Sequence, residues 1–254
     1  LRTVMEHTDT RTVERNVRLL ESLCSVRPRK QEGWAELCAG LAQELVSGVE
    51  AMDREAPSFD WRAREVDRAA VLAGLARALI ATEQFELLAR VVAHALAAPE
   101  RYPPRLVLVP ALEELQPWLK KSLKRSSAAV ARWVAACREQ LEALTANAPE
   151  EPADFRRPAE IACKCADCAE LKRFLDDPRE SVHRFSVRQD RRSHLENAIR
   201  QHKCDLDLRT EERGSPHTLV CTKNTASYQE RLKTYHQDRD RLATVRSIEA
   251  GLPR

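Results

Sequence analysis

The chain has 254 residues, of which 43% are hydrophobic and 32% are charged, and its formal net charge is +3. This balance allows a buried core and excludes a chain that is disordered by composition. An aromatic content of only 5% and a total of six glycines argue against an all-β sandwich or barrel, whereas the abundance of Ala, Leu, Arg and Glu favours helices.

No apolar stretch reaches the roughly 18 residues that a membrane-spanning helix needs. Residues 1–7 (LRTVMEH) also lack the apolar segment of a secretory signal peptide. We therefore expect a cytoplasmic or nuclear protein that is neither secreted nor inserted in a membrane.

The first part of the chain, residues 1–150, is predicted to be a succession of helices. Apolar residues recur every three or four positions, as Leu37, Leu41 and Leu45 do, and such a stripe is typical of a helix face that packs in a core. Short connections between helices favour antiparallel neighbours. The pattern fits an all-helical bundle or an α-solenoid-like domain, and the absence of a clean internal repeat leaves both open. The expected helices are 11–24, 33–52, 67–81, 85–98, 106–119 and 128–144.

A change of composition marks a boundary near residue 150. The segment 148–154 (APEEPAD) is polar and contains two prolines, as linkers do. Residues 156–254 carry an excess of five positive charges, whereas the rest of the chain carries an excess of two negative charges. We therefore predict two domains, 1–150 and 151–254.

The second part, residues 151–254, mixes helical and strand patterns. Two segments with alternating apolar and polar residues flank the turn-forming run Arg213-Gly214-Ser215, which predicts a β-hairpin. The whole is expected to be a small α+β domain that ends in a helix. Its predicted elements are helices 167–175, 193–202 and 225–248, and strands 181–187, 204–210 and 217–222.

Three cysteines lie within six residues of this second part: Cys163, Cys165 and Cys168. Thiolates at this spacing can converge on one ion, and Zn²⁺ favours tetrahedral ligation by sulfur and imidazole nitrogen. His194, on a predicted helix, is our first choice for the fourth ligand. The alternatives are His183, His202, Cys204, His217 and Cys221; Cys204 and Cys221 would face each other if the hairpin turn centred on residues 212–213.

Other chemistries of the cluster stay open at this point. A disulfide within it would need an oxidising compartment. A thioredoxin-type C-x-x-C site would use Cys165 and Cys168, but no βαβ pattern surrounds them. An unliganded cluster is the third alternative. We favour a structural zinc site, which has four protein ligands and no open position for catalysis.

The cluster is the beginning of a longer pattern, which ends with RGSPHTLVCTK at 213–223. This pattern, over about a quarter of the chain, resembles a C-terminal region of large prolyl-4-hydroxylase-like proteins of the 2-oxoglutarate and iron(II)-dependent oxygenase type. The residues that carry the resemblance are Cys163-x-Cys165-x-x-Cys168, Leu171, Phe174-Leu175, Arg192-x-His194-Leu195, Arg213-Gly214-Ser215-Pro216-x-Thr218-Leu219-Val220 and Thr222-Lys223.

The resemblance implies that this chain is the non-catalytic C-terminal part of such a polypeptide, outside its catalytic jelly roll. It also implies that the three cysteines and His194 occupy metal-capable positions, with the Gly-Ser-Pro turn at the hairpin tip. The oxygenase reaction itself needs a facial triad of two His and one carboxylate. The two H-x-D strings, at 7–9 and 236–238, lie in or near predicted helices, where positions i and i+2 point to different faces.

The sequence thus predicts a non-catalytic zinc-binding scaffold, whose partner is another protein or a catalytic domain of the same polypeptide. The main alternative is a zinc-dependent nucleic-acid-binding protein, because Arg191, Arg192, Arg209 and Arg213 lie near the cysteine cluster and the hairpin. A second alternative is an enzyme whose site has no recognisable motif.

Overall fold

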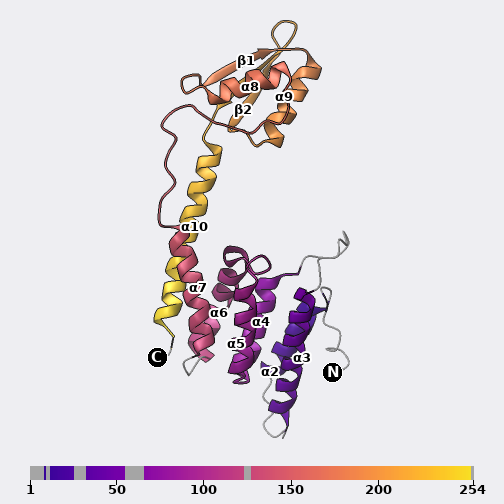
Figure 1. Ribbon diagram of the computed structural model, residues 1–254, viewed down its shortest axis with the longest axis vertical. Coiled ribbons are helices and arrows are strands. Elements are labelled where there is room, and N and C mark those ends of the chain that lie inside the picture. Colours follow the sequence, from indigo (N-terminus) through magenta and orange to yellow (C-terminus); the bar gives the residue numbers. More distant parts are fainter. Residues whose placement is uncertain (1–8, 10–11, 26–32, 55–65, 123–126, 253–254) are drawn as a thin grey trace. The chain divides into compact units, whose positions relative to one another are not determined.

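The computed structural model describes residues 9, 12–25, 33–54, 66–122 and 127–252, and the chain divides into two compact units (Figure 1). Unit 1 comprises Leu1–Ala146 and Asp238–Arg254, and unit 2 comprises Asn147–Gln237. The first limit lies close to the predicted boundary near residue 150. The C-terminal residues differ from the prediction, because they join the helical unit rather than the α+β unit.

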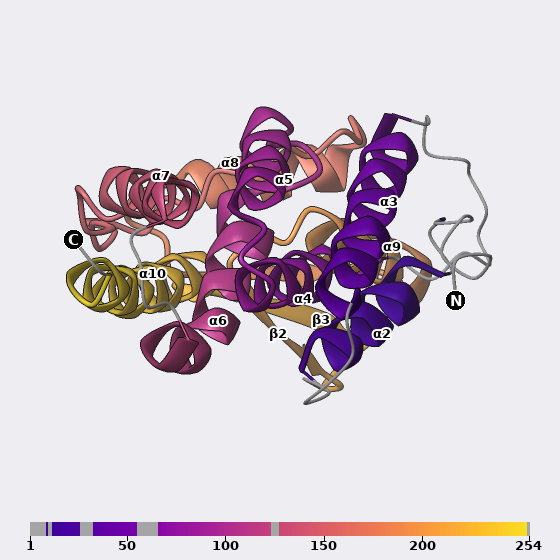
Figure 2. The same cartoon turned by 90° about the horizontal axis from the view of Figure 1, so that it is seen from below.

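Unit 1 is helical, in agreement with the predicted fold class. Helices α2, α4 and α6 pack side by side in one layer, and α3, α5 and α7 form a second layer (Figure 2). Such layers of helices are compatible with both predicted forms, the bundle and the solenoid-like domain. The helices are α2 Val13–Ser25, α3 Trp34–Arg54, α4 Arg68–Ala81, α5 Phe85–Ala97, α6 Val109–Ser122 and α7 Ala128–Leu144, with the π-helix η1 Pro104–Leu108 before α6 and the last part of α10 Ala226–Ala250.

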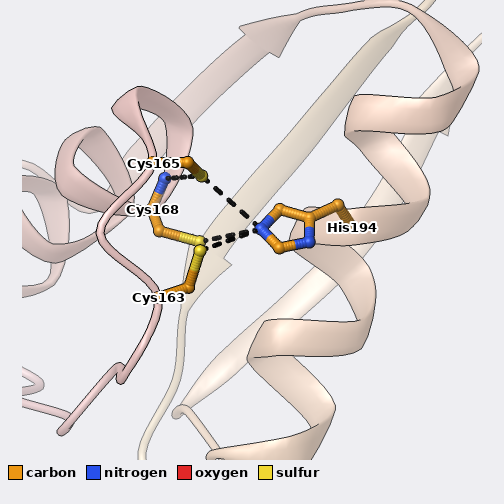
Figure 3. Close-up of side chains that lie close together, drawn as sticks. All are labelled: Cys163, Cys165, Cys168 and His194. Carbon is orange, nitrogen blue, oxygen red and sulfur yellow. Dashed lines mark hydrogen bonds between the residues drawn. The ribbon is translucent and has the colours of Figure 1, made fainter.

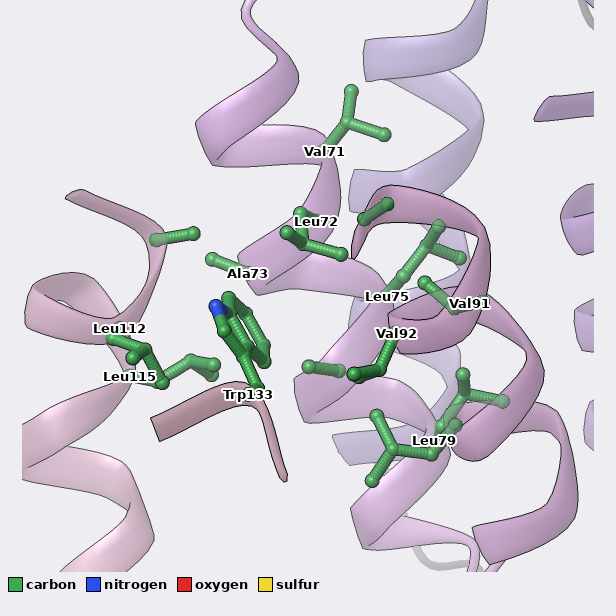
Figure 4. Close-up of a cluster of buried hydrophobic side chains, with 14 of the residues drawn as sticks. Val71, Leu72, Ala73, Leu75, Leu79, Val91, Val92, Leu112, Leu115 and Trp133 are labelled. Carbon is green, nitrogen blue, oxygen red and sulfur yellow. The ribbon is translucent and has the colours of Figure 1, made fainter. Parts of the chain in front are cut away.

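Helix α4 is the centre of the unit 1 core. Its apolar side chains lie between those of α5, α6 and α7, where Leu72, Leu75 and Trp133 are at most 2% exposed (Figure 4). The Trp133 indole N–H donates to the carbonyl of Leu108 at 3.2 Å, so that its polar atom is also paired. Gly74 permits the close approach of α2, since a Cβ there would come within 2.5 Å of Val17. The sequence of residues 67–81 showed a wide apolar surface, and the corresponding helix α4 is buried at the centre of unit 1.

The C-terminal part of α10 belongs to the same core. Leu242, Val245 and Ile248 are buried in it, at intervals of three residues that place them on one helix face. At the beginning of this part, Asp238 is buried and its carboxylate pairs with Arg105. Burial of this apolar face explains why residues 238–254 join unit 1.

A buried carboxylate joins four segments of unit 1. The side chain of Asp53, in α3, is only 2% exposed and accepts hydrogen bonds from Tyr102 Oη at 2.5 Å, His94 Nε2 at 3.0 Å and Arg68 Nη2 at 3.0 Å. Burial alone would raise the pKa of Asp53, but these three hydrogen bonds outweigh it and lower the pKa below its ordinary value. Asp53 is therefore ionised and bonded at neutral pH, and it links α3 to α4, α5 and the segment before η1.

Unit 2 is the predicted small α+β fold, with a three-stranded antiparallel sheet in the order β1-β3-β2. Leu219 lies opposite Phe185 of β1 and Thr210 of β2, and the core below it is formed by α8 and α9. The hairpin turn spans residues 212–217, so that Cys221 lies opposite Leu208 and not Cys204. The elements are α8 Ala166–Asp176, β1 Val182–Ser186, α9 Gln189–Gln201, β2 Leu206–Glu211, β3 Thr218–Lys223 and the first part of α10.

The segment just after the predicted linker is tied into unit 2. The backbone N–H of Arg157 donates to Leu175 at 2.7 Å, at the end of α8. The buried guanidinium of Arg157 donates through Nε to the carbonyl of Asn224 at 2.6 Å, just before α10. These bonds connect the entry and the exit of the unit 2 fold.

None of the helices that the structure describes is long and apolar enough to cross a bilayer.

Replacement of Asp53 by alanine is expected to destabilise unit 1 by about 3 kcal/mol, because Arg68 and Tyr102 would lose a buried charged partner. Urea unfolding followed by far-ultraviolet circular dichroism measures this change. Glu139→Ala is the control, because the side chain of Glu139 is 71% exposed. Equal unfolding midpoints for the two variants would contradict the structural role of Asp53.

Candidate metal centre

Three sulfur atoms and one imidazole nitrogen converge at the junction of α8 and α9 (Figure 3). His194 Nε2 lies 3.4 Å from the sulfur of Cys163, 3.5 Å from that of Cys165 and 3.3 Å from that of Cys168. The four ligand atoms all lie within 4.8 Å of one another. A single ring nitrogen has one lone pair or one proton, so it cannot form three full hydrogen bonds at once.

The distances match a shared metal ion better than they match hydrogen bonding. With Zn–S bonds of about 2.3 Å and Zn–N bonds of about 2.1 Å, tetrahedral geometry separates sulfur and nitrogen ligands by about 3.6 Å. The observed separations of 3.3–3.5 Å are close to this edge length. The cluster could therefore hold a metal ion such as zinc. Among the described residues, it is the group of His, Cys, Asp or Glu side chains whose ligand atoms lie close enough together to do so.

The beginning of α8 positions two of the thiols. Cys165 is the N-cap of the helix, and its sulfur accepts the backbone N–H of Cys168 at 3.4 Å. This hydrogen bond is the main cause that lowers the pKa of Cys165 to about 7. The positive end of the helix dipole acts in the same direction. The exposed Cys165 is thus prepared to be a thiolate, which is the form that binds metals.

Cys168 has the opposite character. It is 1% exposed, and burial followed by the neighbouring thiols raises its pKa to about 12. A bound cation would remove this penalty, because it supplies the positive charge that a buried thiolate lacks. The site therefore combines one exposed thiol that ionises readily with one buried thiol that needs the metal.

An ion pair lies beside the four candidate ligands. Asp167, between Cys165 and Cys168, has a side chain that is 9% exposed and that accepts two hydrogen bonds from Arg191, with Nε–Oδ2 at 2.7 Å. Arg191 lies one helical turn before His194 in α9. The hydrogen bonds from Arg191 lower the pKa of Asp167 below its ordinary value. The pair links the same two helices as the cluster does.

The alternative fourth ligands do not join the cluster. Both ring nitrogens of His183 are engaged, Nδ1 with Glu180 at 2.6 Å and Nε2 with Glu170 at 2.9 Å. Cys221 is fully buried in the sheet, where it packs against the apolar core of unit 2. Among the described residues, the four-ligand group contains His194 and none of His183, His202, Cys204, His217 or Cys221.

The arginines considered for nucleic-acid binding are largely occupied. Arg191 pairs with Asp167, and Arg209 pairs with Glu211 at 2.6 Å. Arg192 is only 6% exposed, while Arg213 lies in the exposed hairpin turn. Pairing and burial reduce the attraction of Arg191, Arg192 and Arg209 for phosphates.

The structure also locates the other cysteines and the H-x-D strings. All eight cysteines are described by the structure, and none of them is in a disulfide. His236 is exposed on α10, whereas Asp238 is buried and paired with Arg105. His7, of the other string, lies outside the described residues. Comparisons with protein-family models, curated proteins and solved structures find no match for this chain.

Sequence reasoning missed two polar side chains that organise this unit, Asp167 and Arg157. Asp167 stands between two candidate ligands, and this position was the one available signal of its proximity to the cluster. Nothing in the sequence distinguishes Arg157 from its neighbour Arg156. A buried guanidinium becomes recognisable only when its carbonyl partners are known.

In the metal-free protein, alkylation by iodoacetamide is expected to occur at Cys165 first, with a half-maximal rate near pH 7. The rate should fall strongly when one equivalent of Zn²⁺ is added. Peptide mass spectrometry of the alkylated chain identifies the modified thiol. Preferential modification of Cys168, or a rate that zinc does not alter, would contradict this description of the cluster.

His183→Gln should remove a pH-dependent contribution to the stability of unit 2. Burial lowers the pKa of His183, but hydrogen bonds with Glu180 and Glu170 outweigh it and raise the pKa above its ordinary value. The contribution is therefore complete below about pH 6.5 and is lost as the pH rises through the folded-state pKa. Urea unfolding at pH 5.5 and pH 8.5 with saturating zinc should show the variant losing more stability at the lower pH. An equal loss of stability at both pH values would count against this role of His183.

Proposed function

We propose that this chain is a non-catalytic interaction module whose second unit is organised by one structural zinc ion. The observation that carries the proposal is the convergence of three sulfur atoms on His194 Nε2 at 3.3–3.5 Å. Four protein ligands fill a tetrahedral zinc site and leave no position for a substrate or a reactive water. The role of the ion is then to hold α8 against α9.

The size of unit 2 supports a structural role for the ion. Its apolar core contains ten buried residues under a three-stranded sheet. A core of this size supplies little net stability, and structural zinc can contribute on the order of 10 kcal/mol to folding at neutral pH. The loss of the ion is therefore expected to unfold unit 2.

Interaction is the activity that the helical unit supports. Layered helical hairpins expose long, regular surfaces that other proteins can bind. We propose that the partner is a protein or a catalytic domain of the same polypeptide. The resemblance to the C-terminal region of prolyl-4-hydroxylase-like oxygenases provides the specific version of this proposal. We propose a cytoplasmic or nuclear location, because no disulfide joins the eight cysteines and reducing compartments keep thiols free.

Metal analysis of the purified chain tests the proposal. We expect one equivalent of zinc in the wild type and less than about a tenth of an equivalent in Cys168→Ser, because hydroxyl oxygen is a poor zinc ligand. In that variant unit 2 should unfold, while the far-ultraviolet signal of unit 1 remains. Cys204→Ser is the matched control, since this thiol lies in unit 2 but outside the cluster.

Full zinc content in Cys168→Ser, or wild-type protein without zinc after purification in zinc-containing medium, would refute the proposed site. Turnover of 2-oxoglutarate by the chain with added iron would refute the non-catalytic assignment. Capture of a defined catalytic domain by the chain, measured by calorimetry, would support the specific version.

A further inference from the structure

The centre formed by zinc, three thiolates and one neutral imidazole carries one net negative charge. Binding of Zn²⁺ with release of three thiol protons changes the net charge at this site from zero to one negative charge, so the location becomes more negative. A fixed positive charge nearby favours the bound state, and an unpaired carboxylate nearby opposes it. Both kinds of group are present beside the ligands, as Arg191 and Asp167.

Arg191 is held in place rather than free in solvent. Its two hydrogen bonds to Asp167 use the planar fork of the guanidinium, which fixes its direction as well as its distance. Asp167 is itself anchored in the first turn of α8, between two of the ligands. The position of the guanidinium is therefore determined by the same backbone that positions the thiols.

The pair lies beside candidate ligands of both helices. Asp167 stands between Cys165 and Cys168 in the first turn of α8, and Arg191 lies one helical turn before His194 in α9. The guanidinium that Asp167 holds is therefore close to the cluster on both helices.

From this geometry we infer that Arg191, oriented by Asp167, is a positioning residue that compensates the negative charge of the metal centre and so raises its affinity for zinc. The inference rests on the proposed zinc site. It also gives Arg191 a role within unit 2, whereas the sequence analysis considered this residue only for the alternative function of nucleic-acid binding. Asp167 has a double effect, because it holds the guanidinium but adds a negative charge of its own.

The test compares metal affinities of variants of the full chain by chelator competition with Zn²⁺, with Co²⁺ absorption as a check on ligand geometry. Arg191→Gln removes the charge and should weaken binding about 10-fold, at the lower end of outer-shell effects. Arg191→Lys keeps the charge but loses the planar fork, so its affinity should lie between those of the wild type and Arg191→Gln. Arg200→Gln is the control, because it removes the same charge from the same helix. The carboxylate that pairs with Arg200 is that of Glu196.

Two further measurements separate charge compensation from a purely structural link. A higher salt concentration should reduce the difference in zinc affinity between the wild type and Arg191→Gln, because salt screens charge interactions but leaves packing contacts unchanged. The double variant Asp167→Asn with Arg191→Gln should bind more tightly than Arg191→Gln alone, since no unpaired carboxylate remains. Co²⁺ spectra of all variants should keep the intensity of tetrahedral sulfur ligation.

Wild-type affinity in Arg191→Gln, or an equal loss in Arg191→Lys and Arg191→Gln, would overturn the inference while the zinc site stands. Wild-type protein that binds neither Zn²⁺ nor Co²⁺ would overturn the zinc site and the inference together. If Arg191→Gln does not fold, Arg191→Lys decides: an affinity about 10-fold below wild type overturns charge compensation, and a smaller loss supports it.

Discussion

Unit 2 depends on the meeting of four ligand atoms from two helices that are separated along the chain by a strand. Cys163, Cys165 and Cys168 surround the start of α8, whereas His194 comes from α9, 26 residues after the last cysteine. A small core and a three-stranded sheet position the two helices. An ion held by the four ligands would join the helices further and would couple the fold of unit 2 to metal binding, as in metal-dependent small domains.

Unit 1 obtains its stability by different means. Its core is continuous and apolar around α4, and its buried charge at Asp53 is satisfied by three protein donors. Burial of many large side chains supplies the driving force for its folding. One chain thus combines a unit with a continuous apolar core and a unit with a small core and a Cys3His cluster that could hold a metal ion. Such a pairing suits a scaffold, since each unit can present its own surface.

The sequence predicted most helices and strands and the position of the thiol cluster, because both are local properties of the chain. Helix periodicity placed α4 and α7 to within one residue of their ends, and the spacing of the three cysteines identified the cluster. The position of His194 in the chain did not identify it as the fourth ligand, because five other His and Cys side chains were also candidates. The choice followed from a predicted helix that could pack over the cysteines, and the structure brings that imidazole to the sulfurs.

Composition, periodicity and spacing were sufficient to predict a helical first part, an α+β second part and a cluster of three thiols. The folded chain was needed to show that Asp238–Arg254 joins unit 1, that His183 is held by two glutamates and that Arg191 pairs with Asp167. Periodicity and spacing report on neighbours along the chain. Burial and charge pairing depend on neighbours in space, which the folded chain alone supplies.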